Sequence, residues 1–464
     1  MLKKWYNFTR KEKEDIMNIQ LSDHFDYKRI LRFTLPSVIM LVFTSIYGVV
    51  DGFFVSNFAS KTAFTAINFI WPYIMMLGAA GFMLGTGGSA FISKVLGEDG
   101  AGAGKRSDRA NKSFSMLIWV SIISGIALGA TGFLTVRPVA YMLGARGAML
   151  EDCVLYGRVL SVSLPAFLLQ NEFQGLFVTA EKPKLGLYVT VAAGIANMLL
   201  DALLVAVIPM GLLGAALATA ASQAVGGILP LFYFARKNGS LLHFGKPSFD
   251  LRALGRICFN GSSELLANIS MSLVGMLYNV QLMHYAGEDG VAAYGVLMYV
   301  NFVFISAFIG YAVGISPVIG YHYGAGNTEE LQGLRRKSML IVVIASVGML
   351  AVSELLAYPL SYMFVGYDEG LMAMTLRGFR LYSFCFLFAG LAIFVSSFFT
   401  ALNNGLISAV QSFARTIVFQ VAGVLILPVW LHLDGIWLSC VAAELLALAL
   451  GLGLLAAFKK KYNY

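Results

Sequence analysis

Long apolar runs recur along the whole of this chain, and they restrict what it can fold into. A helix needs about 20 apolar residues to cross the hydrocarbon core of a bilayer, and twelve stretches of that length can be placed between residues 31 and 458. Of the 464 residues, 58% are hydrophobic and 12% are charged, whereas a soluble domain is about 25% charged. The sequence therefore predicts an all-α polytopic membrane protein with twelve transmembrane helices.

The positions of Lys and Arg indicate how these spans are oriented. Most of the 33 basic residues lie before the first span, after the last span, or in the connections that follow even-numbered spans. Cytoplasmic loops carry an excess of Lys and Arg, so we expect cytoplasmic N- and C-termini and a place in the cell (inner) membrane. The basic residues that give the net charge of +8 are distributed among the connections on one side of the membrane rather than gathered in one surface patch. This distribution argues against nucleic acid as a partner.

The two halves of the chain resemble each other. Residues 88–97 and 315–324 are similar at an offset of 227, and a basic cluster follows each. Six spans per half give the halves the same orientation, so they are expected to be repeats about an axis along the membrane normal, with a binding site between them. The predicted divisions are a cytoplasmic tail (1–28), an N-lobe of helices 1–6 (29–237), a cytoplasmic linker (238–254) and a C-lobe of helices 7–12 (255–464). The tail shows no cleavable signal peptide, and both a surface helix and a disordered segment fit its composition.

Carboxylates inside apolar spans are costly, and they therefore indicate function. Asp51 lies 19 residues after Arg32, and Asp201 lies 17 residues after Lys184, which is roughly 28 and 25 Å along a helix. Asn197 shares a helix face with Asp201. The other carboxylates that we single out are Glu172 and Glu264.

These depths predict a polar cluster in the outer half of the first bundle. A tight hairpin at 209–211 would bring Thr219 to the level of Asp201, so Asp51, Asn197, Asp201 and Thr219 can converge. This all-oxygen set suits a hard monovalent cation, and its two carboxylates equally suit a shared proton. The structural alternative is a polar cluster that only fixes helix packing. Because the second half does not reproduce the set, we expect ion coupling in the first half alone.

Three further residues invite a functional interpretation. Glu172 and Glu264 lie at similar depths from the inner face, where they could face a central cavity and attract cationic substrates, or could pair with a neighbouring helix. Pro36 removes a backbone hydrogen bond early in the first span, which makes it a candidate hinge; a static kink is the alternative.

The sequence does not indicate a structural metal site, disulfide bonds or an enzyme active site. Four scattered cysteines (Cys153, Cys258, Cys385 and Cys440) have neither metal-ligand spacing nor a disulfide framework. A zincin motif and a cluster of catalytic histidines are both lacking in the sequence. We therefore expect no enzyme activity, no cofactor, and no metal beyond a coupling Na⁺.

Taken together, several segments resemble the multidrug and toxic compound extrusion (MATE) family, over essentially the whole chain and most closely its bacterial multidrug-exporter branch. In the first half they are 35–37, 47–51, 164–165, 170–171, 179–184, 197–201 and 211–219, and in the second half 261–264, 291–295 and 317–321. The resemblance implies two six-helix bundles in a V shape and a cation site at Asp51, Asn197, Asp201 and Thr219. Gln170 and Asn171, in one of these segments, join Glu172 and Glu264 as candidates for contact with substrate. One departure is that span 10 (378–402) contains no Asp or Glu, which argues against a second-lobe cation site.

The resemblance also implies a function. We expect an antiporter that works by alternating access and exports small cationic or amphipathic drugs in exchange for Na⁺ or H⁺, as a monomer surrounded by membrane lipid. The alternatives are a lipid or lipid-linked oligosaccharide flippase, which would favour Lys and Arg in mid-span, and a passive channel.

Overall fold

The computed structural model describes residues 19–59, 61–101, 106–246 and 248–464, and these residues form helices without a strand. The first half contains α2 (Tyr27–Phe58), α3 (Lys61–Glu98), α4 (Asp108–Leu143), α5 (Gly147–Thr179), α6 (Pro183–Asp201), the π-helix η1 (Ala202–Val207) and α7 (Gly211–Ala235). The second half contains α8 (Leu251–Gly324), α9 (Thr328–Val365), α10 (Glu369–Ser383), α11 (Cys385–Ala401), α12 (Gly405–Phe413), the π-helix η2 (Ala414–Phe419) and α13 (Gln420–Tyr462).

The helices are long and apolar enough to cross a membrane. Within the described residues, nine continuous helical segments meet this criterion, and α10 with α11, bent by 42°, forms a tenth. Two of the ten contain a break in the backbone, at Gly287 (φ 62°) and at His432 (φ 48°). Each break divides its segment into two lengths that can each span a bilayer, so the structure is consistent with the twelve spans that the sequence predicts.

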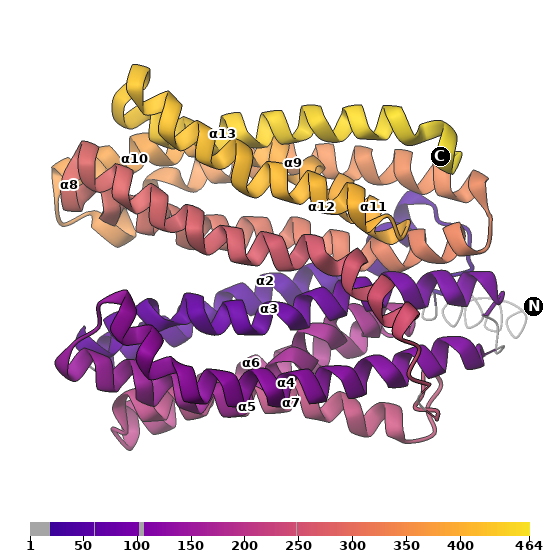
Figure 1. The fold of residues 1–464 in the computed structure, drawn as a ribbon. Coiled ribbons are helices and arrows are strands. Elements are labelled where there is room, and N and C mark those ends of the chain that lie inside the picture. The colour runs from indigo at the N-terminus through magenta and orange to yellow at the C-terminus, as the bar shows by residue number, and fades with distance from the viewer. Residues whose placement is uncertain (1–18, 60, 102–105, 247) are drawn as a thin grey trace, which may run out of the picture.

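The two halves of the chain form separate helical bundles. Figure 1 shows α2–α7 gathered on one side and α8–α13 on the other, with both ends of the described chain at the same end of the molecule. We call this the basic end; it comprises residues 19–26, the connections between α3 and α4, α5 and α6, α7 and α8, and α8 and α9, and the C-terminus. The predicted pair of related bundles is therefore confirmed.

Glycines allow the bundles to touch near the basic end. A Cβ atom on Gly87 would lie 2.1 Å from the Ile257 carbonyl oxygen, and one on Gly261 would lie 1.9 Å from that of Met83. Only glycine lets two helix backbones approach this closely. At the repeat offset of 227, Gly87 corresponds to Gly314 and Gly261 corresponds to Thr34. These two residues also pack together, because a Cβ on Gly314 would lie 3.0 Å from the Thr34 Cα. The internal repeat of the sequence thus appears as a pseudo-twofold pair of contacts.

A second symmetric contact lies closer to the basic end. A Cβ on Gly97 would lie 2.0 Å from the Tyr321 carbonyl oxygen, and one on Gly324 would lie 2.0 Å from the Lys94 carbonyl oxygen. These four positions are again related by 227 residues. The bundles are therefore joined at one end of the molecule, as the V-shaped arrangement requires.

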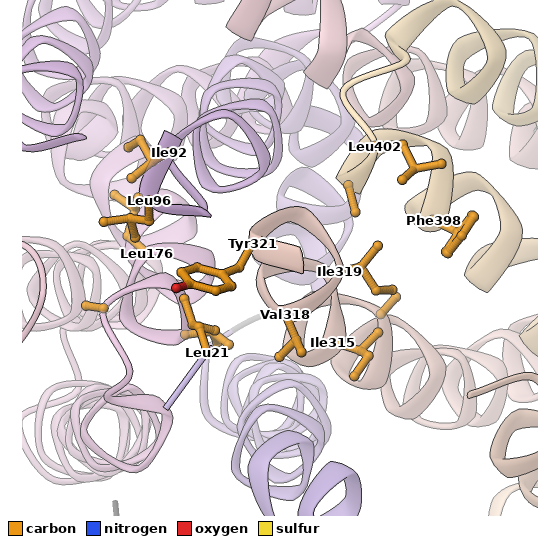
Figure 2. Close-up of a cluster of buried hydrophobic side chains, with 14 of the residues drawn as sticks. Leu21, Ile92, Leu96, Leu176, Ile315, Val318, Ile319, Tyr321, Phe398 and Leu402 are labelled. Carbon is orange, nitrogen blue, oxygen red and sulfur yellow. The ribbon is translucent and has the colours of Figure 1, made fainter. Parts of the chain in front are cut away.

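The segment before α2 reinforces this junction. The Leu21 N–H donates to Glu181 Oε1 of the first bundle at 2.6 Å, and the Phe25 N–H donates to Glu330 Oε1 of the second at 2.8 Å. Figure 2 shows Leu21 and Tyr321 beside Leu176 and below Leu96, in the buried apolar cluster at this junction. Residues 19–26, which fall in the predicted tail, are thus packed between the bundles, whereas residues 1–18 of that tail lie outside the described residues.

The predicted linker also packs against the first bundle. The His243 N–H donates to Asn111 Oδ1 at 2.9 Å and the Gly245 N–H donates to Ser115 Oγ at 2.9 Å. Helix α8 starts at Leu251, inside the linker range 238–254, because Asp250 caps it by accepting from the N–H groups of Arg252 and Ala253.

Candidate functional site

Two carboxylates from different helices lie together inside the first bundle. Asp51 is in the second half of α2, and Asp201 is the last residue of α6. Their side chains are close enough to share a hydrogen bond when one of them is protonated. Asp201 is fully buried. Two acidic side chains in contact at such a position cannot both carry a charge cheaply.

The backbone at Asp201 is unusual. Helix α6 begins at Pro183, a residue suited to the first helical position, and continues regularly to Asp201. The next six residues, Ala202–Val207, form the π-helix η1. Short π-helical insertions occur frequently at functional sites, because the wider turn redirects side chains. Asp201 therefore stands where α6 changes its geometry.

The neutral members of the predicted cluster lie in the same region. Asn197 is one turn before Asp201 and is buried. Thr219, on α7, lies against Tyr156, which is also near both carboxylates. Oxygen atoms of all four residues are buried without a hydrogen-bond partner among the described residues: Asp51 Oδ1, Asn197 Oδ1, both Asp201 carboxylate oxygens and Thr219 Oγ1. Buried polar atoms are rarely left unpartnered, so these oxygens are suited to receive an ion or a proton.

The donor set limits which ion it could hold. It offers hard oxygen ligands, which suit Na⁺ rather than a soft transition metal. Among the described residues, His, Cys, Asp and Glu form no group of three that could hold a metal ion. The same two carboxylates could instead share one proton.

Two tyrosines beside this cluster were not predicted from the sequence. Tyr156 of α5 is buried near Asp51, Asp201 and Thr219. Tyr47 of α2 lies near Asp51 and against Gln170. Tyrosine is common in apolar spans, so no sequence pattern distinguishes these two. Only the spacing of Tyr47, one helical turn before Asp51, could have pointed to it.

Two of the three other candidates in the first bundle, Glu172 and Gln170, are buried between its helices. Glu172 is fully buried in α5 beside Ser121 of α4, and no described residue donates a hydrogen bond to its carboxylate. Gln170 is buried against Gly226 of α7, and Asn171 Nδ2 donates to the Phe167 carbonyl at 2.9 Å. The structure therefore places Glu172 and Gln170 among packed helices rather than on an open wall.

The second bundle contains a different set of charges. Arg415, in η2, donates from Nε to both carboxylate oxygens of Glu444 on α13, at 3.0 and 2.8 Å. Glu264, on α8, lies within the electrostatic influence of Arg415. Of these three residues, only Glu264 is singled out from the sequence, and the pairing of Arg415 with Glu444 comes from the structure. With its one cation so engaged, this cluster carries a net negative charge when its carboxylates are ionised.

Pro36 lies inside α2, which continues through it from Tyr27 to Phe58. The helix is therefore not interrupted, although Pro36 cannot donate a backbone hydrogen bond at this turn. The role of Pro36 as a hinge stays a prediction.

Two pseudo-symmetric bundles of apolar helices, with carboxylates enclosed in one of them, define a multi-pass α-helical membrane protein with the build of a transporter. A family model described as MatE matches residues 36–203 and 265–426, which is well over half of the chain. The protein belongs to the MATE family.

Curated relatives agree over nearly the full length. The chain is 25% identical over 441 residues to a protein of Staphylococcus saprophyticus named "Multidrug export protein MepA", covering 91% of this chain and 92% of the relative. It is 25% identical over 442 residues to the protein of that name from Staphylococcus aureus, with the same coverage.

Solved structures share the fold. One described as an outward-facing conformation of a multidrug resistance MATE family transporter superposes with a TM-score of 0.84 at 23% identity, over 94% of this chain and 98% of that chain. A transporter from Pyrococcus furiosus, described as having a binding pocket of reverse polarity, superposes with a TM-score of 0.85 at 22% identity, over 94% and 97% of the two chains.

Proposed function

We propose that this chain is a secondary active antiporter, which exports small cationic or amphipathic organic compounds in exchange for Na⁺ or H⁺. The observation that carries the proposal is the contact between Asp51 and Asp201, with unpartnered oxygens of Asn197 and Thr219 nearby. The export of drugs is suggested by the names of the full-length relatives.

The coupling would arise from the energy of these buried carboxylates. Without an ion, two negative charges inside the bundle repel and lack donors, which favours a rearrangement of α2 against α6. With Na⁺ or a proton bound, the pair is neutralised and the packed arrangement is stabilised. An ion drives transport only if its affinity differs between the two conformations, and the same difference then applies to the substrate.

The contacts at the basic end would form the closed gate of this conformation. If the basic end is cytoplasmic, as the distribution of Lys and Arg suggests, the described state is closed to the cytoplasm. Opening it would require the Leu21–Glu181 and Phe25–Glu330 hydrogen bonds to break and the glycine contacts between α3 and α8 to separate.

The charges also support a cationic substrate over an anionic one. In the interior of the described spans, away from their ends, carboxylates outnumber cations: Asp51, Glu172, Asp201, Glu264, Glu354 and Glu444 against Arg158 and Arg415. Arg415 is already paired with Glu444. A binding region with surplus negative charge attracts organic cations and disfavours the anionic lipid headgroups that a flippase would carry.

Efflux from proteoliposomes tests the proposal. A fluorescent organic cation is loaded, and Na⁺ and pH gradients are imposed separately. Efflux that accelerates with one gradient, and stops when that gradient is collapsed, is the expected result. Substrate movement that is indifferent to both gradients would favour a channel, and movement of labelled lipid between leaflets would favour a flippase; either outcome contradicts antiport.

A further inference from the structure

A cavity at the basic end lies apart from the carboxylates Asp51 and Asp201 and borders the segment that packs between the two bundles. It has a volume of about 640 Å³ and is bordered by residues 32–39 of α2, by the first turns of α6, by Ile19 and by the connection before α6. Its lining divides into a charged part and an apolar part. The charged residues are Arg32, Glu181, Lys182 and Lys184, and the apolar residues that matter here are Leu35, Ile39, Leu187 and Tyr188.

The charged part is positive. Among the described residues, Arg32, Lys182 and Lys184 form no ion pair, and Arg32 and Lys184 are exposed. The one carboxylate, Glu181, accepts the Leu21 N–H at 2.6 Å and is thus engaged with the segment before α2. Helix α6 begins here without a side-chain cap, so its positive end adds to the field. The group that fits this part is an anion, such as a phosphate.

The apolar part continues from the cations toward the middle of the spans. Leu35 and Ile39 follow Arg32 by one and two turns of α2 and are 53% and 45% exposed, while Tyr188 follows Lys184 by one turn of α6 and is 66% exposed. Both helices begin at the basic end, so the order from charged to apolar is the same on both walls. Exposed apolar side chains at this depth of a membrane protein face lipid.

The cavity lining ends at Ile39 and Tyr188, and we infer how far the groove between α2 and α6 continues from the point where the two helices close together. Helices α2 and α6 come together at Gly194, where an added Cβ would lie 2.5 Å from the ring of Phe43. Gly194 is ten residues beyond Lys184, which is roughly 15 Å along a helix. Half of a hydrocarbon core of about 30 Å has the same depth. A free phosphate would use only the first part of this groove, whereas the acyl chain of a phospholipid would fill the rest.

We propose that this cavity is a binding site for an anionic phospholipid of the cytoplasmic leaflet, with the headgroup phosphate held by Arg32, Lys182 and Lys184 and an acyl chain lying in the groove between α2 and α6. Basic pockets between helices on the cytoplasmic side bind acidic headgroups in this way. Residues 1–18 are a poorer match for the occupant, because their sequence has more basic than acidic residues. Since the cavity also contains Pro36 in its wall, a bound lipid would contact α2 at its proline.

Lipid retention measured by native mass spectrometry tests this site without reference to transport. The full-length protein is purified with equal amounts of phosphatidylglycerol and phosphatidylcholine, and the lipids that stay bound are counted. We expect preferential retention of phosphatidylglycerol, reduced about tenfold or more in the triple variant Arg32→Gln, Lys182→Gln, Lys184→Gln, given a substantial contribution from each cation near a headgroup. The matched control Lys459→Gln, Lys460→Gln, Lys461→Gln removes the same charge from the same end and should retain the lipid.

Three kinds of result would overturn the proposal. The first is equal retention of the two lipids by the wild-type protein, or undiminished retention of phosphatidylglycerol by the triple variant. The second is displacement of the lipid by millimolar inorganic phosphate, which would indicate a site for a free anion. The third is displacement by a synthetic peptide of residues 1–18, which would indicate that this segment is the occupant.

Discussion

Arg415 and Glu444 form a bifurcated ion pair within the second bundle, in which Nε of the arginine donates to both oxygens of the carboxylate. The exposed fractions of the two side chains are only 19% and 5%. Removing one partner of such a pair leaves a buried charge uncompensated, whereas replacing both can be nearly neutral.

We therefore expect Glu444→Gln to destabilise the protein by about 3–5 kcal/mol, and Arg415→Met combined with Glu444→Leu to cost much less. Thermal melting in detergent measures both. Arg137→Gln is the control, because its partnership with Glu151 is solvent-exposed and is expected to contribute less than about 1 kcal/mol. Equal losses for the single and the double variant would show that the pair is not a coupled unit.

The contact of Gly97 with Tyr321 gives a prediction about the gate. A Cβ at Gly97 would lie 2.0 Å from a backbone oxygen, which no rotamer change can relieve, so Gly97→Ala should force α3 and α8 apart at the basic end. We expect faster labelling of a cysteine placed at Ala101 and impaired transport. Gly348→Ala is the control, since nothing lies within 4 Å of its added Cβ. Unchanged labelling in the Gly97 variant would contradict the closed junction.

Glu181, outside the spans, predicts a pH dependence of the segment before α2. Burial raises the pKa of Glu181 from 4.5 to about 7, with smaller opposing effects of the Leu21 N–H and Lys182. Because the folded-state pKa is raised, the stability gained by burying the neutral carboxyl is complete below its ordinary pKa and is lost as the pH rises through about 7. Hydrogen exchange of residues 19–26, corrected for its intrinsic rate, should therefore accelerate between about pH 6 and pH 8.

The variant Glu181→Gln stays neutral and should remove this pH dependence. Glu288→Gln is the control, because Glu288 is exposed and lies beside the break at Gly287 in α8. This variant should leave the pH dependence of exchange intact. The explanation fails if the corrected exchange rates of the Glu181 variant still change with pH as in the wild type.

Tyr156 gives a more graded prediction about the carboxylate cluster. Its hydroxyl lies near Asp51, Asp201 and Thr219, so Tyr156→Phe removes a polar neighbour while keeping the packed ring. We expect this hydroxyl to donate to one of these oxygens when the ion is bound, which contributes about 0.5–1.5 kcal/mol, so without it the apparent affinity for the coupling ion should fall by about twofold to thirteenfold. The ion-concentration dependence of efflux measures this change, and Tyr73→Phe, in α3, serves as the control. An unaltered ion affinity in the Tyr156 variant would exclude that tyrosine from the cluster.

The sequence predicted the spans and the central carboxylates for the same physical reason. Hydrocarbon excludes charge, so Asp51 and Asp201 stand out from their neighbours, and a constant rise per residue places them at similar depth. The symmetric contacts of Gly97 and Gly324 likewise reflect a repeat that is visible in the sequence. The roles of Asp51 and Asp201 in ion binding remain predictions.

Other features of the fold and of the charged clusters depend on tertiary packing, which a local sequence pattern does not specify. The π-helix after Asp201 and the breaks at Gly287 and His432 come from the tertiary structure, although Gly287 was available as a sequence signal. The sequence left both a central cavity and a neighbouring helix open as the surroundings of Glu172, because it indicates the depth of this residue but not the rotation of its helix. The pairing of Arg415 with Glu444 required the relative placement of η2 and α13, which spacing along the chain does not give.

Replacement of Asp51 tests the central claim most directly. Asp51→Asn keeps the size of the side chain but removes its charge, and Asp289→Asn does the same at an exposed position. In proteoliposomes with matched protein content and melting temperature, ion-driven efflux of an organic cation should fall to the level of protein-free vesicles for Asp51→Asn and stay at the wild-type rate for Asp289→Asn. Ion-driven efflux at the wild-type rate in the Asp51 variant would contradict the account.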